Sequence, residues 1–326
     1  MYPFKIIQAT DNTSAIGAIT GSSKFIGGGT NLLDLMKMNV EKPDRLININ
    51  PLPLNRIEIL KNGNILIGAL LKNSDLAYHP VISKKFPLLS KAILSGASPQ
   101  LRNMATTGGN LLQRTRCYYF FDTQMPCNKR EPGSGCSALT GYNRAHAILG
   151  ASEKCIATHP SDMCVALSAL DAIVHVESAD GKRLIAFADF HTLPGDTPHI
   201  ETQLKPGELI TGVEIPPLSF ASNSTYLKVR DRASYEFALA SAAVALNVKN
   251  GIVNEARIAM GGVGTKPWRM LNAEQNLIGK HASMSVFKET AEVALEGAKA
   301  YQFNSFKIEL AKRTLMRALQ TVGGIS

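Results

Sequence analysis

Two short segments carry glycines, hydroxyls and amides in a pattern that suits an anionic ligand. The first is Phe25-Ile-Gly-Gly-Gly-Thr-Asn-Leu-Leu33, and the second is Ala105-Thr-Thr-Gly-Gly-Asn-Leu-Leu112. Glycine has no Cβ, so a ligand can approach the backbone N–H groups closely. The apolar residues after the first glycine run predict a helix, whose N-terminus adds partial positive charge. Either segment alone could be a tight turn, but together they can enclose one diphosphate from two sides.

Four cysteines crowd into one irregular stretch. Cys117, Cys127, Cys136 and Cys155 follow the spacing C-x9-C-x8-C-x18-C. No C-x-x-C pair occurs, so the spacing fits neither a bacterial ferredoxin nor a zinc ribbon. Structural thiols, a metal site and disulfides all remain open from spacing, although four thiolates are the usual ligands of an Fe–S cluster. Cys164 lies in an apolar helical run and is expected to be a buried core residue.

The two glycine segments resemble the flavin-binding loops of the FAD subunits of molybdenum hydroxylases, the xanthine dehydrogenase family. The resemblance covers nearly the whole chain. It implies a vanillyl-alcohol-oxidase-type FAD-binding fold. The G-x-G-x-x-G pattern of a classical dinucleotide domain is missing, so no Rossmann fold is expected. The FAD contacts that it implies in the two segments are Phe25, Ile26, Gly27, Gly28, Gly29, Thr30, Asn31, Leu32, Thr106, Gly109 and Asn110.

The resemblance implies three further FAD contacts outside the two segments. These are Asp162 in Pro160-Ser-Asp-Met163, Ile210, and Lys228 in Leu227-Lys-Val-Arg230. From the residues alone, Asp162 could equally be a helix cap. An aromatic residue that stacks on the flavin ring in some relatives aligns near Gly96, so no such contact is expected here.

The cysteine stretch is similar to one branch of this family, the FAD subunit of bacterial periplasmic aldehyde oxidoreductase. The similarity lies in residues 113–117, 126–130 and 132–136. It implies a [4Fe–4S] cluster held by Cys117, Cys127, Cys136 and Cys155. It also implies two partner chains in a heterotrimer: a large chain with the molybdenum cofactor and a small chain with [2Fe–2S] centres.

The implied function is electron transfer from the [2Fe–2S] centres through FAD to an external acceptor, with an aldehyde oxidised on the large chain. A related hydroxylase acting on xanthine, CO or an aromatic acyl-CoA is an alternative. A self-contained flavin oxidase is another, but no base or nucleophile constellation supports it, and no catalytic residue is expected. A non-catalytic Fe–S scaffold would leave the glycine segments unexplained. His146, His159 and His199 are expected to be ordinary surface or capping residues.

The elements that position these residues predict an α+β protein. We expect an FAD-binding region over residues 1–220, divided into 1–55 and 56–220, with the Fe–S loop at 113–155. Residues 221–326 are expected to form an antiparallel sheet covered by helices near 283–300 and 305–319. Asn-Gly or Asp-Gly pairs between apolar runs predict hairpins at 62–63, 180–181 and 250–251.

The composition of the chain excludes some functional classes. The chain has 326 residues, 45% hydrophobic residues and a net charge of +9, without the basic runs and interleaved aromatics typical of nucleic-acid binding. No apolar run is long enough to cross a membrane. The N-terminal residues do not resemble a signal peptide. We therefore expect export to the periplasm only with a signal-bearing partner, or else a cytoplasmic location.

Overall fold

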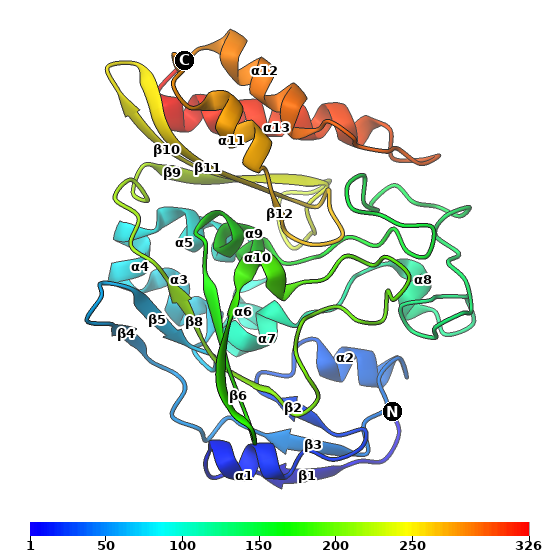
Figure 1. Ribbon diagram of the computed structural model, residues 1–326. Helices are drawn as coiled ribbons and strands as arrows, with labels where there is room; N and C mark the ends of the chain where they lie inside the picture. Colours follow the sequence, from blue (N-terminus) through cyan, green and yellow to red (C-terminus); the bar gives the residue numbers. More distant parts are fainter. Residues whose placement is uncertain (326) are drawn as a thin grey trace.

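The structure is a computed structural model that describes residues 1–325, and it contains three β-sheets. Figure 1 shows them in layers, with the N-terminal sheet at the bottom, a larger sheet with short helices in the middle, and a C-terminal sheet with three helices at the top. The predicted α+β class is confirmed. No helix among residues 1–325 is long and apolar enough to span a bilayer.

The N-terminal sheet is parallel and carries the first glycine segment. Its strands are β1 (Lys5–Gln8), β3 (Arg45–Asn48) and β2 (Lys24–Ile26), in that order. β2 ends directly before the glycines, and α2 (Leu32–Lys37) begins directly after them. Helix α1 (Asn12–Gly17) begins directly after Asp11, because Asp11 and Ser14 form a capping box.

The middle sheet is antiparallel, and its central strand comes from far along the chain. The strand order is β4 (Ile57–Ile59), β5 (Ile65–Gly68), β8 (Leu209–Ile215), β6 (Ile173–Ser178) and β7 (Gly181–Ala186). Both predicted hairpins, β4–β5 and β6–β7, are present. The helices of this layer are α3 (Asn73–Tyr78), α4 (Pro80–Lys85), α5 (Pro87–Ser95), α6 (Pro99–Met104), α7 (Thr107–Leu111), α9 (Asp162–Ala169) and α10 (Phe187–Phe190).

The C-terminal sheet is also antiparallel, in the order β12 (Trp268–Arg269), β11 (Ile252–Gly261), β10 (Ala240–Lys249) and β9 (Ser224–Val229). Helices α11 (Leu271–Leu277), α12 (Met284–Ala294) and α13 (Phe306–Gly323) cover one face of it (Figure 1). Leu315 and Leu319 of α13 are fully buried in the core that these elements share with Val244 and Leu246 of β10. Helix α9 lies against the other side of this sheet, and all of its residues are buried, which explains why its sequence is apolar on every face.

Residues 113–155 form an irregular segment at one side of the molecule, next to α2 and the beginning of α13. Its one helix is the short α8 (Tyr118–Phe121). Phe120 is fully buried and packs in a small cluster with Leu35 of α2 and Cys127. The segment therefore has its own anchor against the first glycine segment.

Candidate functional site

A cavity of about 710 Å³ lies between the two glycine segments. Its volume is within the usual range for a site that encloses a small organic ligand or cofactor. Segments from all three layers contribute to its wall. Among the predicted FAD contacts, the residues that line it are Phe25, Ile26, Gly27, Gly28, Gly29, Thr30, Asn31, Leu32, Thr106, Gly109, Asn110, Asp162 and Lys228.

Ile210 is the one predicted contact that the structure does not bring to this cavity. Ile210 lies on β8 opposite Val176 of β6 and is 5% exposed. Its side chain packs in the hydrophobic core between the middle sheet and its helices. Gly96, by contrast, does line the cavity, and a Cβ there would lie 3.1 Å from Asp162 Oδ2.

The glycines of the first segment are required because the backbones of the two segments are in close contact. A Cβ on Gly28 would lie 2.0 Å from the carbonyl oxygen of Met104, which directly precedes the second segment. A Cβ on Gly27 would lie 3.1 Å from Thr106 Oγ1, and Gly29 has a φ of +71°, which favours glycine. The absence of side chains thus lets two backbones meet at one edge of the cavity, besides leaving room for a ligand.

Four buried polar atoms on the cavity wall have no hydrogen-bond partner among the described residues. They are Asn31 Nδ2, Asn73 Oδ1, His159 Nε2 and His191 Nδ1. A buried polar group without a partner costs roughly 1–3 kcal/mol, so such groups normally mark a ligand or an ordered water. The hydroxyls, carbonyls and phosphates of FAD offer partners to both donors and acceptors. This wall therefore fits FAD.

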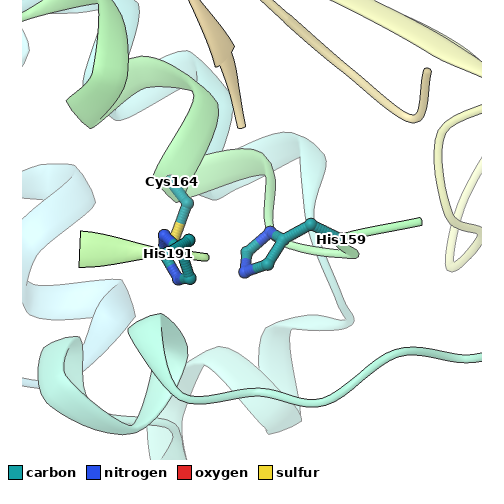
Figure 2. A group of neighbouring side chains, drawn as sticks. All are labelled: His159, Cys164 and His191. Atoms are coloured by element: carbon teal, nitrogen blue, oxygen red, sulfur yellow. The ribbon is translucent and has the colours of Figure 1, made fainter. Parts of the chain in front are cut away.

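His159 and His191 line this cavity, and their rings point toward each other and toward Cys164 of α9 behind the wall (Figure 2). The possible ligand atoms of the three residues all lie within 4.8 Å of one another. Their tautomers follow from their neighbours. Leu111 O accepts a hydrogen bond from His191 Nε2 at 3.0 Å, which leaves a lone pair on Nδ1. The amide of Ser161 donates to His159 Nδ1 at 3.3 Å, which places the hydrogen on Nε2.

Both imidazoles are neutral at pH 7, because burial lowers the pKa of His191 to about 4 and the pKa of His159 well below its ordinary value. A metal ion at this position would need a lone pair on His159 Nε2. The Ser161 amide already uses the lone pair of Nδ1, so Nε2 carries the ring hydrogen and has no lone pair to offer. The pair therefore suits hydrogen bonding to a ligand, His159 as donor and His191 as acceptor. The expectation that His159 is an ordinary surface or capping residue is wrong. Cys164 is fully buried as predicted, and burial raises its pKa to about 12.

Asp162 joins the middle layer to the C-terminal sheet. Its Oδ2 lies 2.8 Å from Lys228 Nζ, and its Oδ1 accepts a hydrogen bond of 2.6 Å from Tyr226 OH. The N-cap of α9 is Ser161, whose Oγ accepts from Cys164 N. Asp162 is therefore not the helix cap, and its carboxylate is held at the cavity wall by two residues of β9. Burial, together with this carboxylate, raises the pKa of Tyr226 well above its ordinary value.

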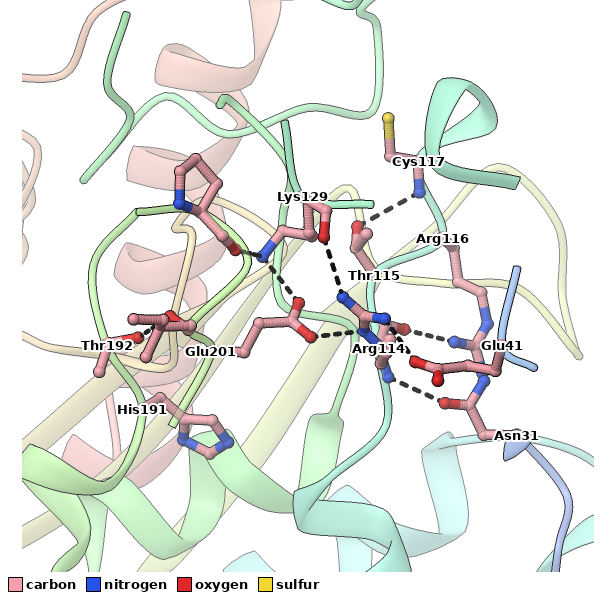
Figure 3. A network of polar contacts seen from close by, with 12 residues as sticks. Asn31, Glu41, Arg114, Thr115, Arg116, Cys117, Lys129, His191, Thr192 and Glu201 are labelled. Carbon is pink, nitrogen blue, oxygen red and sulfur yellow. Dashed lines mark hydrogen bonds and ion pairs between the residues drawn. The ribbon is translucent and has the colours of Figure 1, made fainter. Parts of the chain in front are cut away.

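A partly buried ionic network connects the first glycine segment to the cysteine segment (Figure 3). Arg114 pairs with Glu41 and Glu201 at 2.6 Å each, and its Nη2 donates to the carbonyl of Lys129. Lys129 Nζ lies 2.7 Å from Glu201. Burial would raise the pKa of Glu201, but Lys129 and Arg114 outweigh it and lower that pKa. The backbone N–H of Arg114 donates to Asn31 Oδ1, so the network ends at the first glycine segment.

The sequence alone did not point to Arg114, Glu201 or His191 as part of this site. His191 and Glu201 follow α10 in the connection between β7 and β8, and both line the cavity. The sequence of this connection, Leu193-Pro-Gly-Asp-Thr-Pro198, predicts turns but no chemistry. Only the three-dimensional arrangement shows that it belongs to the cavity.

The four predicted cysteine ligands line a second, much smaller cavity, and all four are free thiols. Burial raises the pKa of Cys117 to about 12 and that of Cys155 to about 11, so these groups are protonated at pH 7 in the absence of a metal. His146 Nε2 lies 3.1 Å from Cys117 Sγ. Four converging thiols are the donor set that an Fe–S cluster takes. The free volume is about 10 Å³, so a cluster fits only if the cysteine side chains turn outward.

Comparison with known proteins agrees with this geometry. Residues 2–218 match the family model for the FAD binding domain in molybdopterin dehydrogenase, and residues 225–322 match that for the CO dehydrogenase flavoprotein C-terminal domain. The chain is 51% identical over 314 residues to the aldehyde oxidoreductase FAD-binding subunit PaoB of Escherichia coli K12, covering 94% of this chain and 95% of the relative. It is 30% identical to the glyceraldehyde dehydrogenase medium chain of Sulfolobus acidocaldarius, covering 89% and 87% of the two chains.

Solved structures show the same fold. Quinoline 2-oxidoreductase from Pseudomonas putida 86 superposes with a TM-score of 0.77 at 23% identity, covering 99% of this chain and 98% of that chain. At that identity the likeness concerns the fold alone. The family models together span nearly the whole chain, and the cavity lies where both glycine segments meet. The chain therefore belongs to the FAD-binding subunits of the molybdenum hydroxylase family and is an oxidoreductase subunit.

Proposed function

We propose that this chain is the electron-transferring FAD subunit of a molybdenum-dependent aldehyde oxidoreductase. In this proposal, electrons reach it from [2Fe–2S] centres in a small partner chain and leave it for an external acceptor. The observation that carries the proposal is the cavity in which the two glycine segments face Asp162 and Lys228. The 51% identity to an aldehyde oxidoreductase subunit supports the aldehyde as substrate of the complex.

The residues of this chain bind and orient the flavin. The amides of residues 27–31 would face the diphosphate of FAD, with Asn31 and Asn110 among the polar partners of the cofactor. The amides of residues 107–110 already donate to acceptors within the chain, so the second segment would contribute polar side chains and glycine backbone without a Cβ. The neutral imidazoles of His159 and His191 offer one donor and one acceptor. Bound FAD supplies the ability to accept electrons as a pair and to release them singly or as a pair. The wall contributed by Asp162 and Lys228 holds fixed charge beside the cofactor.

We further propose that Cys117, Cys127, Cys136 and Cys155 hold a [4Fe–4S] cluster. The four thiols converge on one cavity, and no competing disulfide forms among them. Metal binding would release their protons, since the ligands are thiolates. The network around Arg114 would then connect the cluster segment to the flavin segments.

The partners in this proposal are a large chain with the molybdenum cofactor and a small chain with [2Fe–2S] centres, together a heterotrimer. Relatives with names such as medium chain support a multi-subunit assembly. We propose periplasmic location by co-export with a signal-bearing partner, with the cytoplasm as the alternative. Fractionation of cells that express the chain with and without its partner chains tests this, because co-export predicts periplasmic protein only when the partners are present.

The central test separates this chain from its partners. The purified, FAD-loaded chain is mixed with aromatic and aliphatic aldehydes and an electron-accepting dye, and the same assay is run on the co-expressed complex. We expect turnover by the complex and none by the chain alone. Turnover by the isolated chain, free of molybdenum, would show that it is a self-contained flavin oxidase instead.

A further inference from the structure

A third cavity, of about 400 Å³, adjoins the flavin cavity. The two share a wall formed by Arg116, Thr158, His159, Pro160, Asp162, Glu236 and Phe237. A ligand in the third cavity would therefore be separated from the flavin cavity by a single layer of side chains. None of the residues predicted to hold FAD lines this cavity except Asp162.

The rim of the third cavity is aromatic and its floor is polar. Tyr118 and Tyr142 line it and are 59% and 51% exposed, and the Arg116 guanidinium lies 5.2 Å above the ring of Phe237. On the floor, His146 is 3% exposed, and its Nδ1 has no partner among the described residues. Its other ring nitrogen faces Cys117 Sγ. An aromatic rim above a buried polar group favours a flat ligand with a polar edge.

Charge narrows the class of ligand. Arg144 of the lining pairs with Asp231 at 2.8 Å, and Asp162 is neutralised by Lys228. Arg116 forms no ion pair among residues 1–325, and only its Nη1 donates within the chain, to the carbonyl of Arg114. It is therefore the one cation of this lining that has no carboxylate partner and can meet a ligand oxygen. A nicotinamide dinucleotide would need a place for its pyrophosphate. The lining holds one glycine, Gly262, and no helix N-terminus with a glycine run.

We propose that the third cavity binds a quinone of one or two rings, which serves as the electron acceptor of this chain. The inference rests on the proposed function, because the electrons come from the flavin. The quinone takes up two electrons and two protons and becomes the hydroquinone, while the reduced flavin returns to its oxidised form with the loss of the same electrons and protons. Arg116 is placed to donate to a quinone oxygen, and His146 Nδ1 to accept from a hydroquinone hydroxyl.

The test uses menadione as the quinone and the FAD-loaded full chain. Tyr118→Ala/Tyr142→Ala removes the two exposed tyrosines of the rim without touching the flavin cavity, whose lining includes neither residue. The matched control is Tyr78→Ala, because Tyr78 is 67% exposed and lines none of the three cavities. Binding is measured by calorimetry. Reoxidation of the dithionite-reduced protein is followed by flavin absorbance, with menadione and separately with ferricyanide.

We expect the double variant to bind menadione about tenfold more weakly than the wild type and the control, and to be reoxidised by it correspondingly more slowly at subsaturating concentrations. Its FAD content and its reoxidation by ferricyanide should stay unchanged. Equal menadione binding by all three proteins, or none by the wild type, would overturn the proposal. So would unchanged binding with loss of co-purifying partner chains, which would make the rim a subunit contact. A wild-type chain that binds no FAD would instead refute the proposed function.

Discussion

Lys228 Nζ and Asp162 Oδ2 lie 2.8 Å apart, and their side chains are only 4% and 8% exposed. The pair connects β9 of the C-terminal sheet to the first turn of α9, at the wall of the flavin cavity. Because both charges are buried, neither is stable there without the other. The pair thus fixes the position of the two layers at the cofactor.

The first prediction concerns this pair. Lys228→Met leaves the Asp162 carboxylate with Tyr226 as its one side-chain donor, so we expect the free energy of unfolding to fall by about 3 kcal/mol and FAD to bind more weakly. Urea unfolding and flavin content measure the two effects. Lys182→Met is the control, because its contact with Glu177 is 4.0 Å long and exposed. If Asp162→Asn/Lys228→Met is no more stable than Lys228→Met, the unpaired charge is not the cause.

The second prediction concerns contact between the glycine segments. Gly28→Ala should be enough to lower FAD content about tenfold or more, because its Cβ would meet the Met104 carbonyl at 2.0 Å. Absorbance of the purified protein at flavin wavelengths gives the content. Gly17→Ala is the control, since a Cβ there meets no atom within 4 Å. Full flavin occupancy in Gly28→Ala would mean that the two segments do not meet as the structure shows.

The third prediction concerns the cysteine cavity. Cys127→Ser should lose iron and acid-labile sulfide, because a serine hydroxyl is a much poorer ligand than a thiolate. Cys164→Ala should retain them, since Cys164 lies within α9 and does not line this cavity. A chemical assay of iron and sulfide in the two variants and the wild type tests this prediction. Equal iron in both variants would rule out the four proposed ligands as a set.

The fourth prediction concerns the ionic network between the two sites. Arg114→Met leaves Glu41 and Glu201 without their shared cation, and Glu201 keeps only Lys129. We expect iron and FAD contents to fall together, with a loss of about 3 kcal/mol in the free energy of unfolding. Arg313→Met, which breaks an exposed pair with Glu309 on α13, is the control and should change neither content. Loss of one cofactor with the other at full occupancy would show that the network does not connect them.

The fifth prediction concerns pH. Lys307 Nζ is fully buried and donates to the carbonyls of Ala145, His146 and Gly262 at 3.2, 2.8 and 2.5 Å. Burial lowers its pKa from 10.5 to about 7. Between these values the unfolded chain binds one proton more than the folded protein, so raising the pH through this window favours folding. Below pH 7 the cost of burying the charge is present in full.

The matching experiment compares the wild type with Lys307→Met by urea unfolding across that window. The Met variant leaves three carbonyls unpaired and should be less stable throughout. The wild type should gain stability relative to it as the pH rises from about 7 toward 10.5. A difference that does not change with pH would show that Lys307 keeps its ordinary pKa in the folded protein.

Local signals in the sequence predicted the elements that rest on short-range chemistry. The Asn-Gly and Asp-Gly hairpins form where expected, and the two amphipathic helices are α12 and α13. The first glycine segment lies between β2 and α2, so the predicted helix follows it. In these cases turn chemistry and hydrophobic period act within a few residues, so the sequence carries the information directly.

The site residues that the sequence did not predict depend on contacts between residues far apart in the chain. His191 and Glu201 lie in the connection between β7 and β8. This connection is brought to the cavity because β8 pairs with β5 in the middle sheet. Ile210 was assigned to the cavity by resemblance, whereas the pleat of β8 turns its side chain into the core. In the sequence, Arg114 cannot be distinguished from a surface cation. Only the structure shows that it pairs with Glu41 and Glu201, which are far apart in the chain.

The position of β8 in the middle sheet sets the order in which the protein can fold during synthesis. β5 ends at residue 68, and its neighbour β8 begins at residue 209. While the ribosome makes the intervening residues, the inner edge of β5 has no partner and its apolar side chains are exposed. Such long-range pairing is slow, and the open edge is prone to aggregation. The flavin wall that depends on β8 therefore closes only after this strand has emerged, so cofactor loading must follow translation of the whole FAD-binding region.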